Sequence, residues 1–126
     1  MTTTETIRRI VFDVDGVLCD NSDLNIPYYE RPPYPFVADR LLALKEKGYQ
    51  IILQTARGMC KFSGDQRKCD EYHRADLTHW LHKHGIPFDE LYFGKADGQL
   101  YVDDRAFRLR SGDGLYGWEW LRAVLG

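Results

Sequence analysis

Residues Ile10 to Leu18 read Ile-Val-Phe-Asp-Val-Asp-Gly-Val-Leu, and this segment points most directly to the fold class. Its apolar start, which ends at Asp13, is typical of a buried parallel strand, and open α/β sheets bind ligands at the carboxyl ends of such strands. Side chains two residues apart in extended backbone share a face, so Asp13 and Asp15 can point into one site. Gly16 allows a sharp turn or a close backbone approach. Two carboxylates without a nearby base favour a bound cation, and Mg²⁺ with its hard oxygen ligands is the best candidate.

The composition is that of an ordinary globular protein. We expect one domain, 1–126, because 126 residues bury one core but not two. Hydrophobic residues make up 44% and charged residues 29%, and the net charge of −2 gives no general field that would attract a polyanion such as nucleic acid. No apolar run is as long as a membrane span, so no membrane partner is expected. Residues 1–5 read as a short polar lead-in rather than a signal peptide.

The cysteines and histidines do not predict a metal site of their own. Cys19, Cys60 and Cys69 lack metal-binding spacing and indicate free thiols in a reducing cytosol, so we expect a cytoplasmic protein. Four histidines could suggest zinc, but His79 and His82 fall on a predicted amphipathic helix, where a solvated polar face explains them better.

Strand and helix patterns alternate along the chain, which predicts an α/β fold with a parallel sheet covered by helices. The expected strands are residues 9–13, 49–55, 91–93 and 100–103. The expected helices are residues 35–47, 69–84 and 115–125. Their predicted buried residues are Val37, Leu41 and Leu44, then Tyr72, Leu77, Trp80 and Leu81, then Trp118, Leu121 and Leu125.

Four stretches, in order, resemble the motifs of the haloacid dehalogenase superfamily. Residues 10–18 match its first motif, an apolar run followed by Asp-x-Asp-Gly, and residues 51–55 match its second, an apolar strand ending in Thr. Lys95 is the candidate for the third motif, a Lys, and residues 101–104 match the fourth, an apolar run ending in paired acids. The resemblance implies a three-layer, Rossmann-like core with a mainly parallel central sheet. The connections, including 19–33, are too short for the separate cap domain that many members carry.

The resemblance also implies a hydrolase that acts on phosphoric monoesters. Asp13 would attack phosphorus and form an aspartyl-phosphate intermediate. Asp15 would protonate the leaving oxygen and then take a proton from the hydrolytic water, and an acid at this position favours phosphatases over the superfamily's ATPases and dehalogenases. The Thr55 hydroxyl would bind a transferring phosphoryl oxygen. Lys95 would offset the charge on Asp13 and the phosphoryl group.

The metal site that the resemblance implies holds Mg²⁺ between the first and fourth motifs. Its ligands would be Asp13, the backbone carbonyl of Asp15 and one of the paired acids. We expect Asp103 to bind the metal directly and Asp104 to act through water or to hold Lys95. Lys95 lies only eight residues before Asp103, and an extended chain spans at most ~3.5 Å per residue, so this connection must cross the sheet almost straight.

The predicted substrate-binding residues are Gly16, Ala56 and Arg57. Arg57 directly follows the second motif, and its fork of donors suits a phosphate or a substrate carboxylate. A solvated loop charge is the alternative interpretation of Arg57.

The substrate class is implied only by the resemblance. Residues 55–59, 87–95 and 100–106 resemble a small capless branch associated with capsule and surface-polysaccharide biosynthesis, although Ala96 replaces that branch's usual Pro. This implies hydrolysis of a small sugar phosphate or a related precursor. One alternative is a nucleotidase or polynucleotide-end phosphatase, in which Tyr28, Tyr29 or Phe62 could stack a base. Another is a catalytically silent binding module. A homo-oligomer would help a capless site to exclude water.

Overall fold

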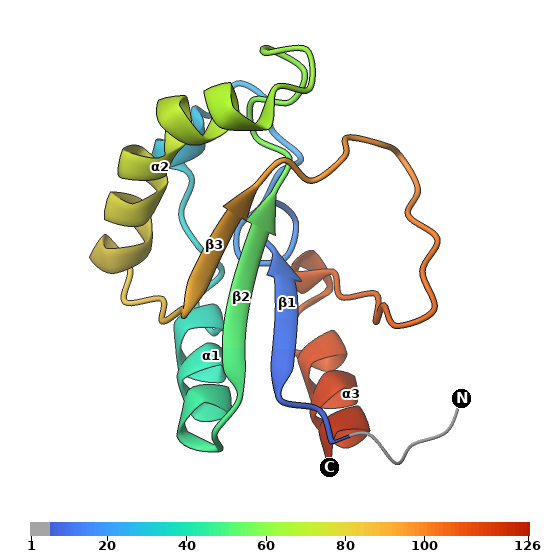
Figure 1. Ribbon diagram of the computed structural model, residues 1–126. Helices are drawn as coiled ribbons and strands as arrows, with labels where there is room; N and C mark the ends of the chain where they lie inside the picture. The colour runs from blue at the N-terminus through green and yellow to red at the C-terminus, as the bar shows by residue number, and fades with distance from the viewer. Residues whose placement is uncertain (1–5) are drawn as a thin grey trace.

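The computed structural model describes residues 6–126, and the polar lead-in expected over residues 1–5 lies outside them. The sheet is formed by β1 (Arg9–Asp13), β2 (Gln50–Thr55) and β3 (Glu90–Phe93), which are parallel and adjacent in that order. The helices are α1 (Val37–Glu46), α2 (Gln66–Lys83) and α3 (Tyr116–Leu125). Figure 1 shows the carboxyl ends of all three strands at the upper edge of the sheet.

The two faces of the sheet differ in burial because strand residues alternate between them. Phe12, Leu53 and Leu91 are side by side in the register and buried in the core. On the opposite face, Val11 is 53% exposed and Tyr92 is 49% exposed. The hydrophobic core therefore lies on one side of the sheet.

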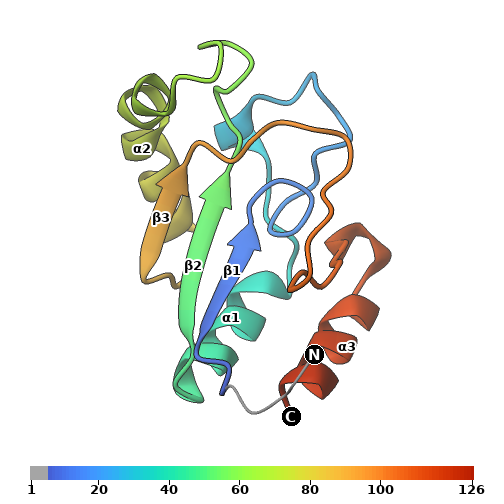
Figure 2. The same ribbon diagram turned by 45° about the vertical axis from the view of Figure 1, so that its right-hand side comes forward.

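The helices cover that same side. The sheet grows in one direction from β1 to β3, and successive right-handed crossovers of this kind place α1 and α2 on one face. Trp118 of α3 stacks on Phe12 with ring centroids 5.7 Å apart. Figures 1 and 2 show the three helices behind and beside the sheet. The predicted α/β class, the parallel sheet and the lack of a separate cap are confirmed for residues 6–126. The helices among these residues form one layer on one face of the sheet. The three-layer core that the resemblance implies would need helices on both faces.

Helix α2 begins at Gln66 rather than at the predicted residue 69. The side chain of Asp65 accepts the N–H of Lys68 at 3.1 Å and caps the helix, a signal that lies within the predicted loop. The buried face of α2 also differs from the prediction, because Tyr72 is 54% exposed while His73 is only 4% exposed.

The fourth strand, predicted over residues 100–103, is absent from the part of the chain that the structure describes. The Tyr101 hydroxyl donates to the carbonyl of Ala96 and accepts the N–H of Gly98, so the chain closes on itself instead of pairing with β1. Val102 is 92% exposed. The residue types favoured a strand, but a strand forms only where a neighbouring strand accepts its hydrogen bonds. Figure 1 shows this segment as a wide loop beyond β1.

The three cysteines are free, as the sequence predicts, and Cys19 and Cys69 are buried. Among residues 6–126, each helix is too short or too polar to cross a lipid bilayer.

Candidate active site

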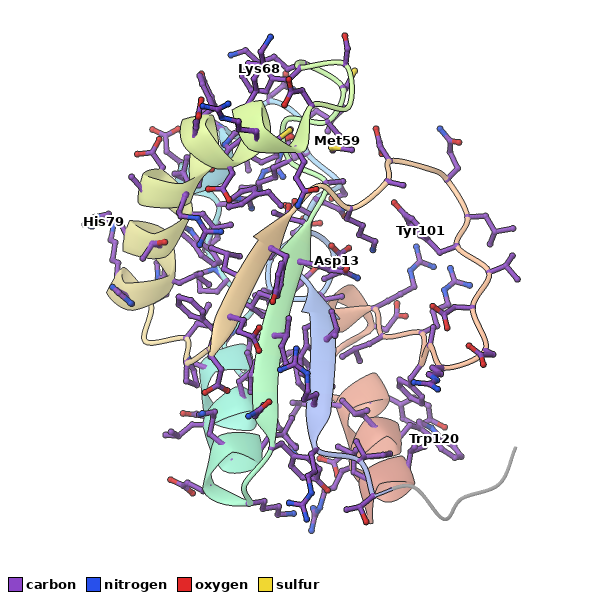
Figure 3. All side chains as sticks on the ribbon, in the orientation of Figure 1. Asp13, Met59, Lys68, His79, Tyr101 and Trp120 are labelled. Carbon is purple, nitrogen blue, oxygen red and sulfur yellow. The ribbon has the colours of Figure 1, made fainter. Side chains whose placement is uncertain are left out.

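Residues from the first three motifs meet at the carboxyl edge of the sheet. Asp13 is the last residue of β1, Thr55 is the last residue of β2, and Lys95 follows the end of β3. The Lys95 Nζ lies 3.5 Å from the Asp13 Oδ2. Figure 3 shows Asp13 at the upper end of β1, and Tyr101 on the loop beside it. The parallel topology thus brings together three residues that lie far apart in the sequence.

Asp13 is a partly buried carboxylate in an unusual electrostatic setting. Burial raises its pKa, the positive charge of Lys95 opposes this rise, and the negative charge of Asp15 adds to it. The Asp13 side chain keeps 31% of its surface exposed, so a ligand can reach it.

Gly94 turns the chain so that Lys95 reaches Asp13. Its φ is +99°, and an added Cβ would come within 2.5 Å of the Gln66 side chain, so both the conformation and the space favour glycine. The N–H of Lys95 donates to the carbonyl of Thr55 at 3.2 Å. The chain therefore leaves β3 and passes over the end of β2 toward β1.

Thr55 and Ala56 form the start of the loop after β2. Thr55 is fully buried, and its Oγ1 accepts the backbone N–H of Arg57 at 3.0 Å, which leaves the hydroxyl hydrogen as a donor. Ala56 is half-buried, and its carbonyl accepts the N–H of Met59 at 3.0 Å. Both residues are thus held by a tight local turn.

Gly16 makes the sharp turn that the sequence predicts. Its φ is +84°, and its N–H donates to the carbonyl of Cys19 at 2.8 Å. The carbonyl of Gly16 accepts the N–H of Ser111 at 3.3 Å. This turn presents Asp15 to the loop of residues 19–33.

Asp15 is held by two buried arginines. Its Oδ2 accepts from the Arg57 Nε at 3.0 Å, and its Oδ1 accepts from the Arg57 Nη2 at 2.9 Å and from the Arg31 Nη1 at 3.3 Å. Arg57 is 2% exposed, so the interpretation as a solvated loop charge is wrong, and its donors face Asp15. Burial by itself lowers the pKa of Arg57, but Asp15 outweighs this effect and raises it. Arg31 could not be predicted as a site residue from the sequence, because no spacing or motif singles it out.

The paired acids of the fourth motif lie away from this cluster. Asp103 and Asp104 are exposed, and the Asp103 Oδ1 accepts the N–H of Arg105 at 2.7 Å. Within residues 6–126, no three acidic, histidine or cysteine side chains are close enough to share a metal ion. The predicted ligands Asp13, Asp15, Asp103 and Asp104 are therefore not brought together, because the strand that would carry the last two does not form.

Tyr28, Tyr29 and His73 form an aromatic cluster next to Arg57. The guanidinium of Arg57 lies 4.5 Å from the ring centroid of Tyr28 and 5.3 Å from that of Tyr29. The Tyr29 hydroxyl is hydrogen-bonded to His73 Nδ1 at 2.6 Å. Burial and then the positive charges of Arg57 and Lys61 lower the pKa of His73, which favours its neutral form. His73 packs against Tyr28 and Tyr29 within this aromatic cluster.

Comparisons with known proteins bear on the fold. No family model matches the chain, and no curated protein matches it. A structural-genomics target from Vibrio cholerae has a crystal structure that is 29% identical with a TM-score of 0.77, over 94% of this chain and 97% of that chain.

Two further solved structures are more distant. The Pnkp1/Rnl/Hen1 complex is 23% identical with a TM-score of 0.50, over 82% of this chain and 32% of that chain. The D,D-heptose 1.7-bisphosphate phosphatase from B. bronchiseptica is 19% identical with a TM-score of 0.49, over 79% of this chain and 54% of that chain. The chain spans nearly the whole Vibrio protein but only part of the other two.

The Vibrio structure shares its fold with this chain over nearly the full length of both, and the Pnkp1 complex contains the same fold within a longer chain. Together they identify the chain as a small protein with the haloacid dehalogenase fold and without a separate cap domain.

Proposed function

We propose that this protein is a phosphomonoesterase that uses Asp13 as a covalent nucleophile. The observation that carries the proposal is the position of Asp13 at the carboxyl end of β1, with the Lys95 Nζ 3.5 Å from its Oδ2. A carboxylate beside a fixed cation suits attack on a group whose oxygens carry negative charge. The fold and the order of the motifs support the same assignment.

The reaction has two halves. In the first, an Asp13 oxygen bonds to phosphorus, the bond from phosphorus to the leaving oxygen breaks, and Asp15 gives that oxygen a proton. In the second, water attacks phosphorus, Asp15 takes a proton from the water, and Asp13 leaves as a free carboxylate. Lys95 stabilises negative charge next to Asp13, and the Thr55 hydroxyl donates to a phosphoryl oxygen after a local opening that uncovers it.

We infer that turnover depends on Mg²⁺, with Asp13 and either Asp103 or Asp104 among its ligands. In the arrangement described above these residues do not form a metal site, so the loop between Gly94 and Arg110 would have to carry an acid to Asp13. A bound divalent cation would neutralise charge on the phosphoryl group. Calorimetric titration with Mg²⁺ tests this inference directly. Binding should weaken in the Asp103→Asn or Asp104→Asn variant and remain unchanged in Asp97→Asn, a control on the same loop.

The best-supported substrate class is a small sugar phosphate or related precursor, as in capsule and surface-polysaccharide biosynthesis. This choice depends on the resemblance of residues 55–59 and 87–95 to that branch. A nucleotide is the second candidate, because Tyr28 is 36% exposed and lies against Arg57 beside Asp15, where a base could stack on it.

Orthophosphate release across sugar phosphates, small polar phosphomonoesters and nucleotides tests the proposed function. Each substrate is measured with Mg²⁺ and with EDTA. Metal-dependent release is expected to vanish in Asp13→Asn and to persist in Asp39→Asn, an exposed acid on α1. Release that survives in Asp13→Asn would refute the nucleophile assignment. A folded protein that hydrolyses none of these esters would favour the silent binding module.

A further inference from the structure

The donors around Asp15 are unequally divided between its two carboxylate oxygens. The Oδ1 accepts from Arg57 Nη2 at 2.9 Å and from Arg31 Nη1 at 3.3 Å, and the Cys19 thiol lies 3.7 Å away as a weak third donor. Among residues 6–126, the Oδ2 accepts from the Arg57 Nε alone, at 3.0 Å. A carboxylate oxygen has about two lone pairs, so the Oδ1 is saturated while the Oδ2 keeps one lone pair free.

We propose that Arg31 and Arg57 are positioning residues that orient Asp15 so that its Oδ2, rather than its Oδ1, exchanges the proton with the leaving oxygen. This proposal rests on the proposed function, because it assumes that Asp15 transfers that proton. It assigns a role to Arg31, which has no place in the motif set. It also changes the expected role of Arg57 from contact with the substrate to control of Asp15.

Both arginines are themselves fixed by the fold. The Arg31 Nε donates to the carbonyl of Ile26 at 3.0 Å, and the carbonyl of Arg31 accepts the indole N–H of Trp80 at 2.8 Å. The Arg31 and Arg57 guanidinium carbons lie 4.7 Å and 4.5 Å from the centroid of the Tyr28 ring. The geometry of Asp15 is therefore set by side chains that cannot easily rotate.

The third guanidinium nitrogen of Arg57, Nη1, indicates that holding Arg57 against Asp15 lowers the stability of the fold. This nitrogen is buried and has no hydrogen-bond partner among the described residues. A buried donor without a partner destabilises a fold, and such groups call for an explanation. The bidentate contact of Arg57 with Asp15 provides one, because the guanidinium cannot satisfy that contact and turn its Nη1 to solvent.

The test separates proton transfer from the other steps by varying the leaving group. Values of kcat/KM are measured for aryl phosphates whose phenols differ in acidity, with wild type, Arg31→Lys and Arg57→Lys. General acid catalysis contributes about 10²–10⁴-fold to a reaction that needs the proton. We expect Arg57→Lys to lose at least about tenfold on phenyl phosphate and under about threefold on p-nitrophenyl phosphate, whose leaving group needs little protonation. Arg57→Lys should therefore lower the ratio of kcat/KM on phenyl phosphate to kcat/KM on p-nitrophenyl phosphate. Arg31→Lys should lower this ratio by a smaller factor.

A matched control variant completes the kinetic experiment. Arg67→Lys, on the exposed side of α2, should leave the ratio unchanged. Equal losses on all aryl phosphates, or none, would overturn the positioning role. Should Arg57→Lys fail to fold, Arg31→Lys and Arg31→Gln carry the same comparison.

A readout without turnover distinguishes this proposal from the proposed function. If wild type hydrolyses no phosphomonoester, the proposed function is wrong, and the orientation of Asp15 is judged by NMR of the arginine Nε–H groups. Asp15→Asn should shift the Nε–H signal of Arg57 and speed its exchange with solvent. An unmoved signal would refute the contact itself.

Discussion

Replacing Ser111 with alanine should destabilise the fold by about 2–4 kcal/mol, because one hydroxyl serves two partly or fully buried groups. The Ser111 Oγ donates to the carbonyl of Val17 and accepts the indole N–H of Trp118 at 2.9 Å. Ser111 is 1% exposed and Trp118 is 3% exposed. This hydroxyl therefore joins the turn after β1, which carries Asp15, to helix α3.

The magnitude follows from the groups that would lose their partners. An unsatisfied buried donor or acceptor costs about 1–3 kcal/mol. The indole N–H of Trp118 is deeply buried and can cost the full range, whereas Val17 is only half-buried, so its carbonyl costs about 1 kcal/mol. The sum is about 2–4 kcal/mol, which is a large part of the stability of a domain this size.

Urea unfolding of a double-mutant cycle measures this effect. Ser111→Ala is compared in the wild-type and Trp118→Phe backgrounds, because phenylalanine has no N–H to leave without a partner. We expect the cost of Ser111→Ala to fall by about 1 kcal/mol or more in the second background. Ser22→Ala, which removes an exposed hydroxyl, is the control and should cost under about 0.5 kcal/mol. A Ser111→Ala cost that is the same in both backgrounds would refute the hydrogen-bond explanation.

Three further predictions concern buried or partly buried groups. Asp13→Asn should keep or raise the unfolding temperature measured by calorimetry at pH 7. Burial raises the pKa of Asp13, so the charged carboxylate is less stable in the folded protein than in the unfolded chain. A clear fall in the unfolding temperature would contradict this reasoning. Burial lowers the pKa of His73, so the unfolded chain binds the proton more readily and stability should fall as the pH drops below about 6.5. Urea unfolding at pH 5 and pH 7 should show that His73→Phe flattens this slope. Trp80→Phe removes the N–H that donates to the carbonyl of Arg31 and should lower the free energy of unfolding in urea by about 1–3 kcal/mol. Trp120→Phe is the control, because Trp120 is 54% exposed and its replacement should cost almost nothing. Equal costs for the two variants would argue against the role of this hydrogen bond.

The sequence predicts most of the fold because hydrophobic periodicity is a local signal. Strand β1 has the predicted bounds, and β2, β3, α1 and α3 differ from the predicted ranges only at their ends. The placement of Asp13 and Lys95 at one edge of the sheet also follows from the sequence, since the carboxyl ends of parallel strands share an edge.

Other features could not be predicted because they depend on contacts between distant parts of the chain. The strand expected over residues 100–103 has the right residue types, but Tyr101 closes the loop onto Ala96 instead. Tyr72 is exposed although the sequence predicts it to be buried, and the adjacent His73 is buried instead. The orientation of α2 about its axis is set by its packing on β3 and on the aromatic residues near Tyr29.

The α/β class, the order of the three strands and three helices, and the position of Asp13 at the end of β1 follow from the sequence. The burial of Arg57, the contact of Arg31 with Asp15 and the separation of Asp103 from Asp13 depend on the three-dimensional packing. The physical reason is that a charged side chain is buried only where a partner offsets its desolvation. The partner of Arg57 lies 42 residues away in the chain, at Asp15.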